Sequence, residues 1–152
     1  MRGRDEVEGE PSLEQIIPFI VFNYQGRYLL IRNPIIGEGK RQGKLYSLGV
    51  RGHLQEEDLE EDLSSWAKRE FEKEVDHLGN LSFEVLGVLN GEDESLGVVI
   101  MAKGDSPQLK MREELKLGKL VTLSEAVGHL PFMNNWSQVV FDFLRSLEEE
   151  RG

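Results

Sequence analysis

An uninterrupted apolar run near the start of the chain is the feature that most limits its fold. Residues 19–22 read Phe-Ile-Val-Phe, with no polar position for either face of a strand. A strand that is apolar on both faces has to be covered on both, which is typical of sheets with helices on each side. A second β-rich run ends at Asn33, and Gln25-Gly26 between the two runs is a hairpin signal. We therefore expect an α/β or α+β sandwich.

Shorter patterns predict the remaining elements. Further strands are expected at 45–48, 81–89, 96–101 and 119–122. A helix is expected over 58–75, a short one from a capping Ser124, and a last one over about 134–149. The last helix repeats apolar residues at helical spacing: Val139, Val140, Phe143, Leu144 and Leu147. Residues 1–12 are predicted to be a flexible tail, and 13–152 a single domain.

Composition narrows the classes of partner. The net charge of −10 repels a polyanion such as duplex nucleic acid. No apolar run approaches the roughly 18 residues that cross a bilayer, and the charged N-terminus is unlike a signal peptide. We expect a soluble, cytoplasmic protein without a membrane partner. Because the chain has no cysteine, any metal would be bound by oxygen or imidazole ligands.

The helix expected over 58–75 carries carboxylates on its apolar side. Asp58 is a good N-cap, and Glu61 stands at the third helical position, as in a capping box. At about 100° per residue, Glu70 and Glu74 fall in the middle of the apolar stripe, whereas Glu72 points outward. The stripe itself consists of Leu59, Leu63, Trp66, Ala67 and Phe71.

Two inward carboxylates require a partner, because an unpaired buried charge costs several kcal/mol. Residues at i and i+4 lie about 5–6 Å apart, a spacing that suits carboxylates sharing Mg²⁺ or Mn²⁺. Two alternatives remain open on geometry alone. The helix register could carry both glutamates to solvent, or they could pair with Arg69 or with a lysine from another element.

This segment resembles the Nudix box, the signature of the Nudix hydrolases. The family pattern is G-x5-E-x7-R-E-U-x-E-E-x-G-U, where U is a bulky apolar residue. Gly52 resembles the opening glycine, Glu61 followed by Arg69-Glu70-Phe71 matches the middle, and Glu74 matches the last metal-binding glutamate. The resemblance implies an α/β/α sandwich with a mixed sheet and a bound Mg²⁺ or Mn²⁺ ion. It further implies hydrolysis of the diphosphate linkage in a small molecule, a nucleoside diphosphate joined to another group.

The resemblance also implies residue roles. Glu70 would position or deprotonate the attacking water, and Glu61 would orient Arg69 beside it. Glu70 and Glu74 would bind the metal. The candidates for substrate binding are Gly52, Lys73, Arg32, Arg41 and Lys44; the last two belong to a basic loop with Lys40, for which a solvated loop is the alternative. Three aromatic residues could stack on a base or belong to the core: Tyr24, Phe132 and Trp136. A homodimer is common enough in such folds to be worth testing.

Three departures from the pattern stand out. Eight residues separate Gly52 from Glu61 where the pattern has five, and Arg51 stands where many members have a second glycine. Lys73 replaces the first glutamate of the E-E pair, and Asp76 replaces the glycine that follows the pair.

The lysine at position 73 removes one negative ligand and adds a positive charge, so affinity for a divalent ion should fall. Two hypotheses compete. In the first, Glu70 and Glu74 bind one ion with help from Glu113 or Glu114, preferably Glu114, and Lys73 stabilises phosphate charge. In the second, Lys73 neutralises the glutamates, and the domain binds a nucleotide or a protein without turnover.

Overall fold

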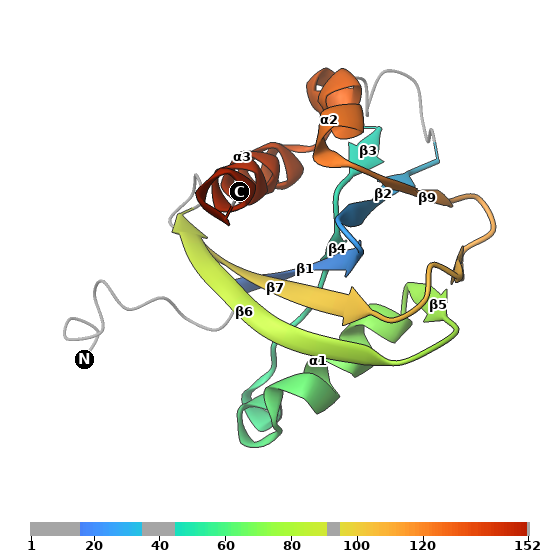
Figure 1. Cartoon of the computed structure of the whole chain (residues 1–152). Helices are drawn as coiled ribbons and strands as arrows, with labels where there is room; N and C mark the ends of the chain where they lie inside the picture. Colours follow the sequence, from blue (N-terminus) through green and yellow to red (C-terminus); the bar gives the residue numbers. More distant parts are fainter. Residues whose placement is uncertain (1–15, 35–44, 91–94, 152) are drawn as a thin grey trace.

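The computed structural model describes residues 16–34, 45–90 and 95–151. Within these ranges seven strands form one sheet (Figure 1): β1 Ile16–Tyr24, β2 Arg27–Arg32, β3 Tyr46–Ser47, β4 Val50–Arg51, β6 Leu81–Asn90, β7 Leu96–Gly104 and β9 Leu117–Val121. Two short strands form a separate ribbon, β5 Val75–His77 and β8 Leu109–Met111. The helices are α1 Leu63–Glu72, α2 Leu123–Ala126 and α3 Asn135–Arg151, with 3-10 turns η3 Glu56–Glu60 and η4 Val127–Phe132.

Strand β1 lies in the middle of the sheet, and its pairings make the sheet mixed. It pairs parallel with β7 and antiparallel with β2 and β4, so the sheet is mixed. The hairpin to β2 turns through Gln25 (φ 51°) and Gly26 (φ 82°). Positive φ at both central residues is the type I′ geometry that matches the twist of the strands.

The apolar run of β1 contributes to two cores, one on each face of the sheet. Phe19 and Val21 belong to the cluster under α2 and α3, whereas Ile20 and Phe22 belong to the cluster under α1. Successive strand residues point to opposite faces, which divides the run in this way. In the second cluster the ring of Phe22 stacks on Phe71 of α1, with centroids 6.0 Å apart. The expected α/β/α arrangement of layers is confirmed, with α1 on one side of the sheet and α3 on the other (Figure 1).

The predicted helix over 58–75 is wrong at both ends, because α1 spans only Leu63–Glu72 and Val75 already belongs to β5. Helix α1 is capped by Asp62, whose side chain accepts a hydrogen bond from the Ser65 N–H at 3.1 Å, and Asp58 lies in η3 instead. Glu61 and Asp62 are extended between the two segments, so residues before them do not share the periodicity of α1. Leu59 is accordingly 60% exposed rather than in the core. Leu63, at the first turn, is also exposed.

Other boundaries differ by small amounts. Helix α2 is capped by Thr122 rather than Ser124, through a reciprocal capping box with Glu125. In α3 the predicted Val140 and Leu144 are buried, and so is Phe141, which was not predicted, whereas Val139 is exposed. The ribbon of β5 and β8 was not predicted, because its strands span only three residues each. The predicted tail at 1–12 lies outside the described residues.

None of the helices in the described part of the chain is both long and apolar enough to cross a membrane.

Candidate functional site

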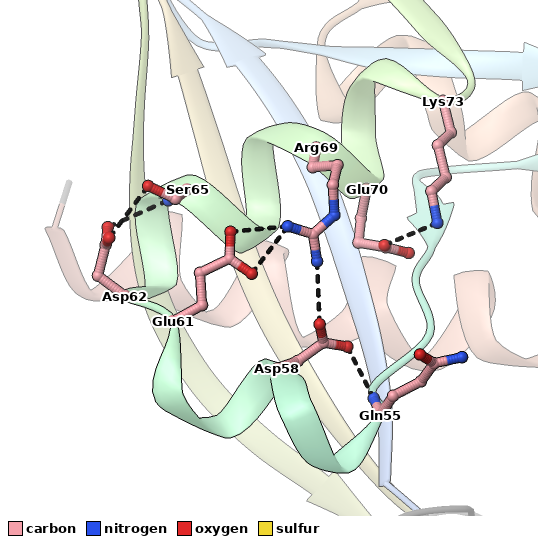
Figure 2. Close-up of polar contacts among 8 residues, drawn as sticks. All are labelled: Gln55, Asp58, Glu61, Asp62, Ser65, Arg69, Glu70 and Lys73. Carbon is pink, nitrogen blue, oxygen red and sulfur yellow. Dashed lines mark hydrogen bonds and ion pairs between the residues drawn. The ribbon is translucent and has the colours of Figure 1, made fainter.

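An arginine fork fixes the entry to helix α1. Arg69 donates from Nη1 to both carboxylate oxygens of Glu61 at 2.7 Å, and from Nη2 to Asp58 at 3.0 Å (Figure 2). The other oxygen of Asp58 accepts the Gln55 N–H at 2.8 Å. The hydrogen bonds to Glu61 raise the pKa of Arg69 above its usual range. The expected approach of Glu61 to Arg69 is therefore present, and it ties η3 to α1.

Glu70 is the buried carboxylate of the segment that resembles the Nudix box (residues 52–76, the box), and 4% of its surface is exposed. Its Oε1 accepts the main-chain N–H of His53 at 3.0 Å, and its Oε2 accepts from Lys73 Nζ at 2.9 Å. Figure 2 shows the lysine side chain leaving the end of α1 and reaching back to the carboxylate. The inward direction predicted for Glu70 is confirmed, and each of its oxygens has a donor.

Glu74 lies just beyond the end of α1 and is half-buried. Its Oε1 accepts from Lys116 Nζ at 3.0 Å, and that lysine also lies 3.7 Å from Glu113. The main chain holds the two segments together, because the Arg112 N–H donates to the Glu74 carbonyl at 3.0 Å and the Arg112 side chain donates to the Glu72 carbonyl. Sequence analysis did not single out Lys116.

The arrangement shown does not fit a divalent ion. In the described ranges no group of three or more histidine or acidic side chains is placed to hold a metal. Each inward glutamate instead faces an ammonium group at 2.9 or 3.0 Å. Glu114 is exposed and lines a different cavity, of about 520 Å³, so it is not brought to the cavity that Glu74 lines.

A cavity of about 300 Å³ opens beside the box. Its lining combines charged residues from the box side with aromatic residues from β1 and α3: Arg51, Glu74, Lys116, Phe19 and Trp136. Asn33, Ser47 and Asn134 add amide and hydroxyl groups, and they are joined by hydrogen bonds from both asparagines to the serine hydroxyl. Such a mixture of aromatic walls and a few polar groups is typical of a small-molecule site.

The described candidates for substrate binding, Gly52, Lys73 and Arg32, are not among the residues that line this cavity. Gly52 is buried, and a Cβ there would lie 3.6 Å from the Glu70 side chain. Arg51 is in extended β4, so its replacement of a second glycine leaves the backbone unstrained. Arg32 is exposed at the end of β2, and its neighbours Ile31 and Asn33 line the cavity in its place. Arg41, Lys44 and Lys40 lie outside the described residues.

The aromatic candidates differ in whether they line the cavity. Trp136 lines the cavity, as does Phe19, which sequence analysis had placed only in a core strand. Tyr24 packs against the cluster under α1, and Phe132 is 50% exposed on η4. Neither is among the residues that line the cavity.

Comparison with known proteins identifies the fold. No protein-family model and no curated protein matches the sequence. Among solved structures, Tm1382, provisionally described as a Nudix hydrolase, is 26% identical with a TM-score of 0.66, covering 88% of this chain and 71% of that one. A MutT protein from Methanosarcina mazei Go1 is 20% identical (TM-score 0.57; 90% and 94% covered). An ADP compounds hydrolase is 16% identical (TM-score 0.61; 90% and 74% covered). The chain therefore has the Nudix fold.

Proposed function

We propose that the protein is a Nudix-type phosphohydrolase that binds a nucleoside diphosphate derivative beside the box and cleaves its diphosphate linkage. The observation that carries the proposal is a cavity with cationic and aromatic lining that Glu74 lines, four residues along the chain from the buried Glu70. Trp136, which is partly exposed, offers a face for the nucleoside. Arg51 and Lys116 offer charge for the diphosphate.

The chemistry assigned to the chain's own residues is positioning and proton transfer. The Glu70 carboxylate would accept a hydrogen bond or a proton from the attacking water, once Lys73 releases one of its oxygens. The main-chain bond from His53 would keep the carboxylate oriented meanwhile. The Arg69 fork would hold the helix that carries Glu70, so Arg69 and Glu61 act as positioning residues.

The resemblance implies Mg²⁺ or Mn²⁺, with Glu70 and Glu74 as the ligands. Both glutamates are bonded to lysines in the arrangement shown, and an ion would have to displace those lysines first. The roles assigned to Glu70, Arg69 and Glu61 therefore involve no bound metal, and the effect of Mg²⁺ or Mn²⁺ on turnover is measurable directly.

One observation favours a second function, namely binding of the same ligands without turnover. Lys73 forms a 2.9 Å ion pair with Glu70, the box carboxylate that is proposed as the base. In this arrangement the attacking water has to compete with the lysine ammonium group for that carboxylate oxygen.

Hydrolysis separates the two functions. The assay incubates a panel of nucleoside diphosphate derivatives with wild type, with and without Mg²⁺ or Mn²⁺, and measures nucleoside monophosphate by chromatography. We expect product from at least one substrate, with a rate lowered about 100-fold or more in Glu70→Gln and unchanged in the control Glu72→Gln. Ligand binding without product would establish the second function. If no compound in the panel were hydrolysed or bound, both proposed functions would be refuted.

A further inference from the structure

Lys116 contributes a cation to the box from outside the box segment. It stands in the connection between β8 and β9, 42 residues after Glu74 in sequence, and its Nζ lies 3.0 Å from the Glu74 carboxylate. The turn that carries it is closed by its own N–H, which donates to the Glu113 carbonyl at 3.1 Å. With 22% of its side chain exposed, Lys116 is the more enclosed of the two box lysines, since Lys73 is 57% exposed.

The formal charges of these two ion pairs cancel. Glu70 and Glu74 carry two negative charges, and Lys73 and Lys116 carry two positive charges in direct contact with them. A divalent ion bound by either glutamate would meet the ammonium group that already contacts that glutamate, at a distance of just a few ångströms. A phosphate group entering the cavity would instead meet Lys116 and Arg51, which both line it.

Lys116 can contact a ligand without leaving Glu74. An ammonium group has three N–H donors in different directions. Glu74 takes one at 3.0 Å, and Glu113 lies farther away at 3.7 Å. Because the lysine also lines the cavity, a remaining donor is available to an anion there.

We infer that Lys116 and Lys73 are fixed cations that act in place of a divalent ion. Lys116 contacts the diphosphate of the ligand in the cavity, and Lys73 keeps Glu70 neutralised. The ligand therefore binds without added metal. The ligand class rests on the proposed function, whereas the inference does not depend on turnover.

Calorimetric titration with ADP and with inorganic pyrophosphate tests the inference, using the full chain in EDTA. Wild type should bind, and Lys116→Gln should bind about tenfold more weakly or worse, since a charge-assisted hydrogen bond is lost. Lys116→Arg should retain binding because the charge remains. Lys119→Gln, on exposed β9, is the matched control and should bind like wild type. Thermal unfolding of each variant verifies that it is folded.

A titration with Mn²⁺ alone supplies the second readout. Wild type should show weak binding or none, and Lys73→Glu should bind the ion at least tenfold more tightly. The control Lys68→Glu, on the same helix and exposed, should match wild type.

Two results would overturn the inference: nucleotide binding that requires Mg²⁺ or Mn²⁺, or equal affinity in wild type and Lys116→Gln. Either would leave the proposed phosphohydrolase standing, because its assay includes metal. An absence of ligand binding with and without metal would overturn both.

Discussion

The contact between Glu70 and Lys73 has a strength that can be worked out from the structure. Its N–O distance of 2.9 Å gives a Coulomb energy of about 1.4 kcal/mol in water and about 6 kcal/mol at an effective dielectric constant of about 20. Glu70 is buried, but 57% of the Lys73 side chain is exposed, which favours the lower value. Ordering the lysine side chain offsets part of the gain, so we expect a coupling energy of about 1 kcal/mol.

A double-mutant cycle measures this coupling. Glu70→Gln keeps an acceptor for the His53 N–H, and Lys73→Met removes the charge at similar length. Urea unfolding of wild type, both single variants and the double variant gives the coupling in the free energy of unfolding. It should decrease when NaCl is raised from about 0.15 to 1 M, because salt screens a partly exposed pair.

The control cycle uses Lys68 and Glu72, one helical turn apart on the same helix, for which at most about 0.5 kcal/mol is expected. A Glu70–Lys73 coupling no larger than that of the control would refute the reasoning. The carboxylate would then be unpaired in solution, and the claim that a lysine neutralises the box would lose its basis.

Three further predictions concern stability. Phe71→Ala should lower the free energy of unfolding by about 3–5 kcal/mol in urea titrations, since the ring is fully buried against Phe22, and a loss below about 1 kcal/mol would contradict this packing. Gly52→Ala should leave the melting temperature within a few degrees of wild type, because its Cβ meets only ordinary contacts at 3.4 Å or more and no positive φ is involved; a large drop in calorimetry would show that the glycine is required. The hydrogen bond from the Ser65 N–H lowers the pKa of Asp62 below its usual 3.8, so the carboxylate stabilises the fold above that pH and loses its contribution as pH falls through the lowered pKa. Melting temperatures of wild type and Asp62→Ala should therefore differ at pH 7 and converge in strong acid, and a constant difference would exclude a charged cap.

The sequence predicted the structure correctly where the residues of a single segment determine the environment of that segment. Phe-Ile-Val-Phe at 19–22 predicted a doubly covered strand, since no register of such a run leaves a polar face. Gln25-Gly26 predicted the turn that follows this strand, and in the structure both residues adopt positive φ. The direction of Glu70 followed from its phase relative to Trp66 and Phe71, which are both buried on α1.

The predicted start of the helix was wrong because two nearby residues are both suited to cap it. Asp58 and Asp62 are both good helix caps, and Asp62 became the cap of α1 by accepting bonds from both the N–H and the hydroxyl of Ser65. Asp58 instead bonds Gln55 and Arg69, contacts that depend on how η3 folds back. A helical periodicity counted from Leu63 assumes a continuous helix, so it could not reveal the extended residues that separate η3 from α1.

The partner of Glu74 could not be predicted for a different reason. Lys116 is distant in sequence and is brought to the box by the three-residue pairing of β5 with β8, in which Val75 faces Met111. Strands this short have too few residues to show alternation. Sequence analysis did leave open a lysine from another element as the partner of the inward glutamates, and the structure supplies one for Glu74.

The connection between β8 and the end of α1 has a consequence for local unfolding. Arg112 bonds the carbonyls of Glu72 and Glu74, and the adjacent residues form the β5–β8 ribbon. The last turn of α1 therefore cannot fray by itself, as helix ends ordinarily do. It opens together with the ribbon, as one cooperative unit whose opening would separate Lys116 from Glu74. Amide hydrogen exchange at β5 and β8 can therefore follow the opening of this unit without any ligand.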